Sequence, residues 1–263
     1  LNKTLFDRFA ADVGASEEML LHFESLFDLC CQYYDWSNGV EMFQINDFYH
    51  YFLANITGLG GQFIRGGKLD CNSEEFERVY LPMARAAIHG GLCVGDGYAS
   101  DRWKTAEVIS NIGSTAGMLY LRDYVTYENN TTEDIETAVY PYPTFSGASP
   151  VVVQRGTGLF AMKSEDPRKN EAAAIFGKWI TEEKHNLDFA VGSGYLPVTE
   201  DAFSSLFSNM SIIENKKFHI LYDAVDQMYG SYTFCPLPLY DNSGKTQESF
   251  EHAMKSILLK YRN

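Results

Sequence analysis

The chain has few basic residues and no long apolar run. Lys and Arg total 21 against 35 Asp and Glu, which gives a formal net charge of −14. Nucleic-acid phosphates and anionic lipids need clustered positive charge, so this balance argues against both partners. No run reaches the roughly 18 consecutive apolar residues of a membrane-spanning helix. At 263 residues with 45% hydrophobic content, the chain can form one large domain or two modest ones.

Cysteine is also scarce, and its positions lack the spacing of a metal site or a redox motif. The five are Cys30, Cys31, Cys71, Cys93 and Cys235, an odd number. Neither a disulfide framework nor a zinc-type ligand set follows from them. We predict no metal and no cofactor, and we expect Cys30 and Cys31 to be core thiols because they fall within a predicted helix.

Residues 155–198, RGTGLFAMKSEDPRKNEAAAIFGKWITEEKHNLDFAVGSGYLPV, contain the most ordered pattern in the chain. Small residues at 156–158 allow close backbone approach, and the apolar run 159–162 has strand length, so a buried strand is predicted there. Further on, a short helix is predicted to stop at Gly192. Residues 195–197 should leave it extended, because the residue before proline avoids the helical region.

Between these pieces the sequence predicts an amphipathic helix. Ser164 or Asp166 can cap it, and Pro167 fits its first turn. Phe176 and Trp179 share one face at helical spacing, so this face is expected to pack on the preceding strand.

In this order the pieces resemble the signature region of extracellular solute-binding proteins, family 1, the sugar-binding receptors of ABC importers. In that family a strand of glycine and small residues, a helix of the pattern "sknpeaAweFlkwLts" and a "GYLPV" exit follow one another. Here they read GLFAMKSEDPRKNEAAAIFGKWIT and GYLPV. Within the family the chain is similar to the glycerol-phosphate and maltose-type binders over nearly its whole length.

The resemblance implies an α/β fold of the type II periplasmic-binding-protein kind, with one lobe nearly complete and part of the second. It implies capture of an extracellular sugar or related small polar solute in an interlobe cleft without chemical change, and no catalytic residues. The implied partner is the membrane permease of a bacterial ABC transporter. A monomer is expected, lipid-anchored at the extracellular face of the cell membrane or periplasmic.

The resemblance also predicts the domain organisation. Residues 1–6, LNKTLF, resemble the family's "yNkdlF", which follows the first crossover between the lobes. The chain is therefore expected to begin partway through a longer protein. Residues 1–150 and 211–263 should build the C-terminal-type lobe. Residues 151–210 should belong to the N-terminal lobe, whose first part would be absent.

Two strand-to-helix junctions can present polar groups to a ligand. Residues 40–45 have strand composition, and Asp47 can start the helix that follows. Residues 106–112 are a second strand candidate, which runs into the turn 113–117, GSTAG, and then a predicted helix over 118–124. Free backbone N–H groups at such a helix start can hold a polar ligand.

The resemblance assigns ligand contacts around these junctions. A sugar site needs aromatic faces together with polar side chains. By its distance to Gly60, Tyr49 matches the cleft aromatic of the glycerol-phosphate binders, whereas a maltose-type alignment shifts this role to His50, and both remain candidates. Counting back from GYLP, Gly156 matches the family's cleft glycine and Tyr195 its cleft tyrosine.

Two departures from the family bear on the ligand. Ser114 and Thr115 match the family's turn, where maltose-type members carry a tryptophan that this sequence lacks. After Pro238, glycerol-phosphate binders carry an arginine that can pair with phosphate, and here Asp241 stands at that place beside Tyr240. A carboxylate there would repel phosphate and accept hydrogen bonds from sugar hydroxyls, so a neutral mono- or oligosaccharide is the expected ligand. The alternative is that this stretch is a solvated turn before the last helix.

Three other functions were considered from the sequence: a hydrolase, a glycosidase and an interaction module. GSTAG fits GxTxG, which is similar to the GxSxG nucleophile turn of α/β-hydrolases, with His185, His219 and His252 following. Threonine is a poor nucleophile on that strained turn, and no HGGG motif is present. A glycosidase would need two paired carboxylates, which the sequence alone does not identify. An acidic interaction module would explain the charge but not the ordered pieces at 155–198.

Overall fold

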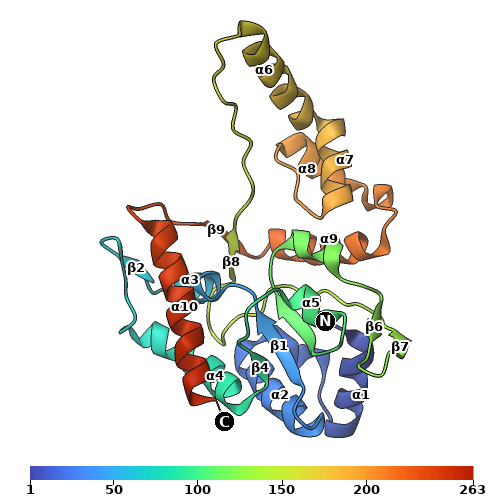
Figure 1. The fold of residues 1–263 in the computed structure, drawn as a ribbon, viewed down its shortest axis with the longest axis vertical. Helices are drawn as coiled ribbons and strands as arrows, with labels where there is room; N and C mark the ends of the chain where they lie inside the picture. Colours follow the sequence, from blue (N-terminus) through green and yellow to red (C-terminus); the bar gives the residue numbers. More distant parts are fainter. Residues whose placement is uncertain (263) are drawn as a thin grey trace. The chain divides into compact units, whose positions relative to one another are not determined.

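The computed structural model describes residues 1–262, and the chain divides into two compact units (Figure 1). Unit 1 comprises Leu1–Gly113, Tyr120–Gln154 and Gln227–Asn263, of which the last residue lies outside the described part. Unit 2 comprises Ser114–Leu119 and Arg155–Asp226. Each unit is therefore assembled from segments that are separated in the sequence.

Unit 1 is built on a parallel three-stranded sheet in the order β4-β1-β5. The central strand β1 (Glu41–Ile45) pairs with β4 (Leu92–Cys93) on one side and β5 (Val108–Ile112) on the other. Four of its five residues are buried on both faces of the sheet. A parallel strand covered on both faces is mostly apolar, and Met42, Phe43 and Ile45 fit that pattern, whereas Gln44 is a buried polar residue. The strands predicted at 40–45 and 106–112 are confirmed.

Helices surround this sheet in unit 1. They are α1 (Lys3–Val13), the 3-10 helix η1 (Glu17–Leu21), α2 (Phe23–Trp36), α3 (Phe48–Gly58), α4 (Glu74–His89), α5 (Ala99–Trp103) and α10 (Ser243–Tyr261). The helix α2 packs on both α4 and β1, and α10 lies along α3 and α4 (Figure 1). The last long helix of the chain therefore packs against elements from its first third.

Aromatic rings fill the space between α3, α4 and α10. The ring centroid of Phe52 lies 4.8 Å from that of Phe76 and 5.4 Å from that of Phe250. Phe63 stacks on Phe52 at 6.0 Å. Phe52 has no exposed surface. Stacked and edge-to-face pairs at these distances add to the stabilisation from buried area.

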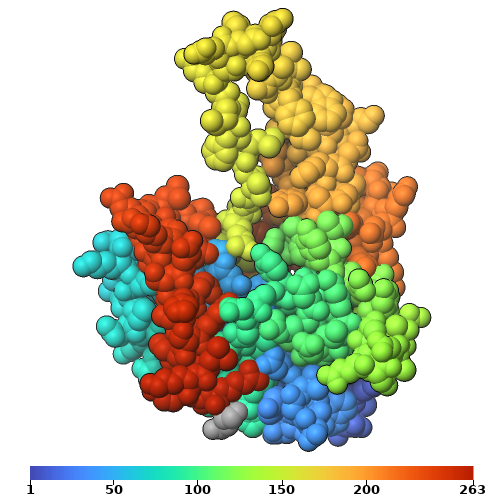
Figure 2. All heavy atoms as spheres, in the orientation of Figure 1, coloured from blue at the N-terminus to red at the C-terminus, as the bar shows by residue number. Residues whose placement is uncertain are grey.

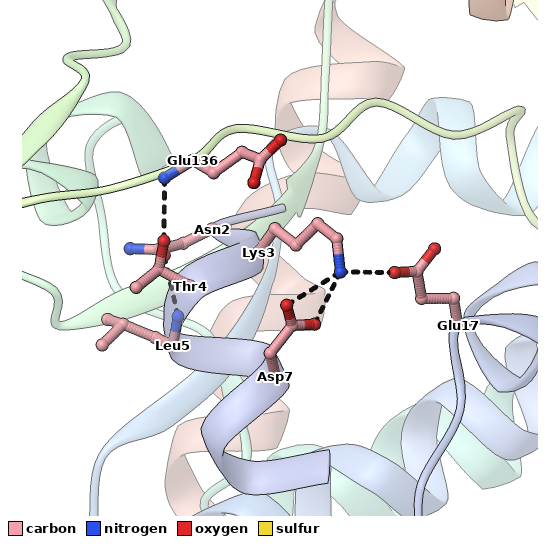
Figure 3. A network of polar contacts seen from close by, with 7 residues as sticks. All are labelled: Asn2, Lys3, Thr4, Leu5, Asp7, Glu17 and Glu136. Atoms are coloured by element: carbon pink, nitrogen blue, oxygen red, sulfur yellow. Dashed lines mark hydrogen bonds and ion pairs between the residues drawn. The ribbon is translucent and has the colours of Figure 1, made fainter. Parts of the chain in front are cut away.

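The start of α1 is fixed by polar contacts (Figure 3). Asn2 caps the helix, because its side-chain oxygen accepts a hydrogen bond from the Leu5 N–H at 3.1 Å. The Lys3 ammonium lies 2.7 Å from both Asp7 and Glu17. The lysine therefore joins α1 to the start of η1.

Short paired strands complete unit 1. They form three two-stranded sheets: antiparallel β2 (Ile64–Arg65) with β3 (Lys68–Leu69), antiparallel β6 (Tyr124–Thr126) with β7 (Thr132–Asp134), and parallel β8 (Val151–Gln154) with β9 (Thr233–Pro236). The last pair joins two distant segments of unit 1.

Unit 2 is mostly helical. Its elements are the 3-10 helix η2 (Thr115–Tyr120), α6 (Pro167–Thr181), α7 (Glu183–Ser193), α8 (Glu200–Ser208), the 3-10 helix η3 (Met210–Ile212) and most of α9 (Lys216–Tyr229). The buried Tyr222 on α9 donates its hydroxyl to the carbonyl groups of Ala190 at 2.7 Å and Tyr195 at 2.8 Å. This side chain therefore ties the end of α7 to α9.

The prediction of a buried strand at residues 159–162 is wrong. These residues form no strand, and Phe160 is 91% exposed. Figure 2 shows the yellow atoms of this part of unit 2 at the surface of the face in view. A strand needs a neighbouring strand for its backbone hydrogen bonds, and within the described residues none pairs with this segment.

The helix α6 forms with Asp166 as its cap and Pro167 in its first turn, as predicted, but the expected packing of its apolar face is wrong. Phe176 is 52% exposed and Trp179 is 44% exposed. Their rings stack on each other at 5.9 Å. Because the predicted strand does not form, α6 has no strand against which to bury this face.

Two further boundaries differ from the sequence predictions. The helix α7 continues past Gly192 to Ser193 and is capped by Gly194, whose φ of 74° is left-handed. In place of the helix predicted at 118–124, η2 ends at Tyr120, because Tyr124 pairs with Asp134 in the β6–β7 hairpin. The chain passes between the two units at residues 154/155 and 226/227. The lobe boundaries near 150 and 211 stay a prediction.

The cysteines are all free thiols, and Cys30 is buried as expected whereas Cys31 is partly exposed. Burial raises the pKa of both thiols. Within residues 1–262 no helix is both long and apolar enough to cross a membrane.

Candidate ligand-binding site

The carboxyl ends of β1 and β5 lie side by side in unit 1. The chain leaves β1 toward β4 and then crosses to β5 on the opposite side, so the strand order reverses between β1 and β5. Ligands of open α/β sheets bind at such a reversal. The Asn46 N–H donates to the Ile112 carbonyl at 3.2 Å. A Cβ on Gly113 would lie 2.5 Å from Asn46 Nδ2, so these two loops approach each other closely.

Asp47 follows β1 directly and organises the start of α3. Its Oδ1 accepts a hydrogen bond from the His50 N–H at 2.9 Å, and its Oδ2 lies 2.7 Å from His50 Nδ1. Burial disfavours the charged carboxylate, but the hydrogen bonds and charge of His50 outweigh burial, and the pKa of Asp47 is lowered.

His50 is held with one ring nitrogen unused. Its side chain is 12% exposed, and within the described residues its buried Nε2 has no hydrogen-bond partner. Because Asp47 fixes the ring through Nδ1, Nε2 has a defined direction. A buried nitrogen without a partner is costly unless something binds it, so a polar ligand group would satisfy it.

Tyr49 lies beside His50 but is more deeply buried. It is 2% exposed, and its ring contacts Phe63 at 5.4 Å and Phe250 at 6.3 Å between centroids. Its hydroxyl lies 3.4 Å from the hydroxyl of Tyr240. The ring therefore belongs to the core, and only the hydroxyl end is directed at another candidate residue.

Tyr240 and Asp241 lie between β9 and α10. A Cβ on Gly67, in the β2–β3 turn, would come within 3.8 Å of the Tyr240 ring. Tyr240 is partly buried and Asp241 is exposed. The structure thus brings together Tyr49, His50 and Tyr240, with Asp241 following Tyr240 in the chain.

Two polar residues of α10 join this cluster and were not predicted from the sequence. Glu251 Oε1 accepts a hydrogen bond from the Tyr49 N–H at 2.6 Å. Gln247 Nε2 donates to Asp47 Oδ2 at 3.2 Å. Gln247 and Glu251 lie one helical turn apart on α10. The buried Phe250 between them was the only feature of the sequence that indicated either of them. Burial and the neighbouring Asp47 raise the pKa of Glu251 to about 7.

The other candidates lie in unit 2. Thr157 Oγ1, next to Gly156, lies 3.3 Å from the Tyr195 hydroxyl. A Cβ on Gly194 would lie 3.0 Å from the Thr115 carbonyl, so Thr115 is close to the backbone just before Tyr195. Unit 2 therefore brings Thr115, Tyr195 and the residue after Gly156 to neighbouring positions.

Ser114 and Thr115 start η2 with few constraints on their side chains. Ser114 is exposed, and its carbonyl accepts from the Gly117 N–H at 2.9 Å. Two of the three histidines of the hydrolase hypothesis are engaged elsewhere: His185 Nδ1 lies 3.1 Å from the Trp179 carbonyl, and His219 Nδ1 lies 3.0 Å from Asp223. Within the described residues no group of three His, Cys, Asp or Glu side chains could hold a metal ion.

Comparison with known proteins identifies the fold. No model of a known protein family matches the chain, and no curated protein sequence matches it. Among solved structures it is similar to UgpB from Mycobacterium tuberculosis in complex with glycerophosphocholine, with a TM-score of 0.72 and 14% identity. That match covers 96% of this chain and 62% of the other.

Two further structures extend this similarity. The cyclic alpha-maltosyl-1,6-maltose binding protein from Arthrobacter globiformis matches with a TM-score of 0.63 and 15% identity, over 92% of this chain and 60% of the other. An ABC transporter solute binding protein from Agrobacterium radiobacter K84 in complex with ribitol matches with a TM-score of 0.54 and 14% identity, over 95% and 67%.

These similarities show the fold. The chain has the mixed α/β fold of periplasmic binding proteins, as the sequence predicted, and spans about three fifths of the length of UgpB and of the maltosyl-maltose binding protein.

Proposed function

We propose that this chain is part of an extracellular solute-binding protein, family 1, which captures a sugar or related small polar solute for an ABC importer without changing it chemically. The observation that carries this proposal is the cluster at the carboxyl end of β1. There the fixed, unpartnered Nε2 of His50 and the paired hydroxyls of Tyr49 and Tyr240 lie at a strand-order reversal of a solute-receptor fold. Ring faces and oriented polar atoms are the groups by which proteins hold sugars.

The proposal assigns ligand contact to the residues that the resemblance selected. In unit 1 they are Tyr49, His50, Tyr240 and Asp241, and in unit 2 they are Ser114, Thr115, Gly156 and Tyr195. The 3.3 Å contact between Thr157 and Tyr195 supports the second set, because it places the Gly156 segment beside that tyrosine. His50 and Tyr240 are the partly exposed members of the first set.

The proposed ligand is a neutral mono- or oligosaccharide. The exposed carboxylate of Asp241 can accept hydrogen bonds from sugar hydroxyls and would repel a phosphate group. The partners would be this ligand and the membrane permease of the importer. The protein would act as a monomer, either periplasmic or lipid-anchored at the extracellular face of the membrane.

Calorimetry on the complete protein that contains this chain tests the proposal. The panel would contain maltose, trehalose, glucose, ribitol, glycerol 3-phosphate and glycerophosphocholine. We expect saturable binding of at least one neutral sugar, weakened by about 1–3 kcal/mol in Tyr195→Ala through lost ring contact. Tightest binding of glycerol 3-phosphate, or undiminished sugar affinity in Asp241→Ala, would contradict the assignment of the ligand. No binding across a broad sugar panel would contradict capture itself.

A further inference from the structure

Glu251 connects the last long helix to the start of α3, inside the proposed ligand site. Its Oε1 accepts the Tyr49 N–H at 2.6 Å across a sequence separation of 202 residues. One turn earlier on α10, Gln247 donates to Asp47 at 3.2 Å. The position of Tyr49 and His50 therefore depends on two contacts from α10 as well as on the cap by Asp47.

The carboxyl groups of Glu251 and Asp47 also interact, because Asp47 raises the pKa of Glu251 whereas Glu251 lowers that of Asp47. Two ionised carboxylates would repel each other here, whereas a proton on one of them lets the pair share a hydrogen bond. Asp47 already accepts from the His50 N–H and from Gln247, and its Oδ2 lies 2.7 Å from His50 Nδ1, all of which favour its ionised form. The shared proton therefore belongs on Glu251, whose pKa of about 7 agrees with this assignment.

The charged and titratable groups around the pair do not change the assignment of the proton to Glu251. From α3 the pair is faced by His50 and the Tyr49 ring, and Tyr240 lies against Tyr49. On α10, Lys255 is engaged by Asp96 at 3.1 Å. In the adjoining hairpin, Arg65 is engaged by Asp70 at 3.1 Å. His50 is a basic group in direct contact with the pair, through Asp47.

We propose that Glu251 is a positioning residue of the ligand site: it shares one proton with Asp47, and this proton fixes Tyr49 and His50 in their binding arrangement. This inference rests on the proposed capture of a solute. When Glu251 loses the proton, two carboxylates face each other at the start of α3 and their hydrogen bond is lost. Solute affinity therefore decreases as the pH rises through the titration of this pair.

The test compares wild type with Glu251→Gln and Glu248→Gln in the complete protein. A glutamine at 251 can still accept from the Tyr49 N–H and donate to Asp47, but it cannot lose a proton. Glu248 is exposed on the same helix, so its variant removes the same charge away from the pair. Dissociation constants for maltose, ribitol and glycerophosphocholine are measured by calorimetry at about pH 6 and about pH 8. In parallel, NMR follows the Glu251 carboxyl and the Tyr49 ring with pH, without added solute.

For a solute that binds, we expect wild type and Glu248→Gln to lose about 10-fold in affinity between the two pH values, because one proton is coupled to binding. Glu251→Gln should keep its affinity within about twofold. Equal losses in all three proteins would overturn the inference and leave the proposed capture intact. Absence of binding at both pH values would overturn the capture, and the NMR titration then decides separately whether the pair exists. Tyr49 ring signals that do not follow the Glu251 carboxyl would overturn the positioning role.

Discussion

Replacing Glu251 by glutamine should stabilise the protein at high pH and change little at low pH. The folded-state pKa of Glu251 is about 7, against an ordinary value of 4.5. Between these values the folded state holds more protons than the unfolded state, so the free energy of unfolding falls as the pH rises. A shift of this size corresponds to roughly 2.5 kcal/mol between about pH 5 and about pH 8, and the partial exposure of the side chain reduces our expectation to about 2 kcal/mol.

Urea unfolding at about pH 5 and about pH 8, followed by circular dichroism, measures this difference. The change in unfolding free energy between the two pH values should be smaller by about 2 kcal/mol in Glu251→Gln than in wild type. Glu248→Gln should follow wild type, because Glu248 is exposed. If Glu251→Gln showed the same pH dependence as wild type, or became less stable at high pH, the assignment of the buried proton to Glu251 would be wrong.

Three further predictions concern packing, each measured by the urea midpoint at neutral pH. Phe52→Ala should lower the free energy of unfolding by about 3–5 kcal/mol because Phe52 is fully buried. Phe176→Ala should lower it by less than about 1 kcal/mol because Phe176 is half exposed, and equal losses in the two variants would refute the packing described for α6. Gly91→Ala should cost at least about 3 kcal/mol, since a Cβ there would lie within van der Waals overlap of the Cys30 carbonyl, and a neutral effect would contradict that approach. Tyr222→Phe should lower the free energy of unfolding by about 1–2 kcal/mol, because two backbone carbonyls lose their hydrogen-bond donor. Hydrogen exchange should show the faster exchange in unit 2 rather than in unit 1.

Local signals in the sequence correctly predicted helix starts and the strand β1. Asp47 and Asp166 were predicted to start helices, and the side chain of each accepts a backbone hydrogen bond in the first turn of its helix. The buried strand β1 followed from its apolar composition. These features depend on a few neighbouring residues, so a single sequence contains them.

Features that depend on distant partners were not predictable in this way. The run 159–162 has strand composition, but whether it pairs depends on a neighbouring strand that periodicity does not reveal. At the candidate site, the resemblance selected Tyr49, His50 and Tyr240, and the structure brings these together. Glu251 was missed, because one acidic residue among 35 gives no sign that it meets a backbone N–H 202 positions earlier.

The long sequence separation between α3 and α10 also bears on how the protein folds during synthesis. A chain emerging from the ribosome can complete β1, α3 and α4 long before α10 is made. Until then the Tyr49 N–H lacks its acceptor, Asp47 lacks Gln247, and the aromatic face of α3 lacks Phe250. Contacts of such separation form slowly. The candidate ligand site of unit 1 would thus mature only after translation of residue 251, leaving an apolar, uncovered intermediate on which a chaperone could act.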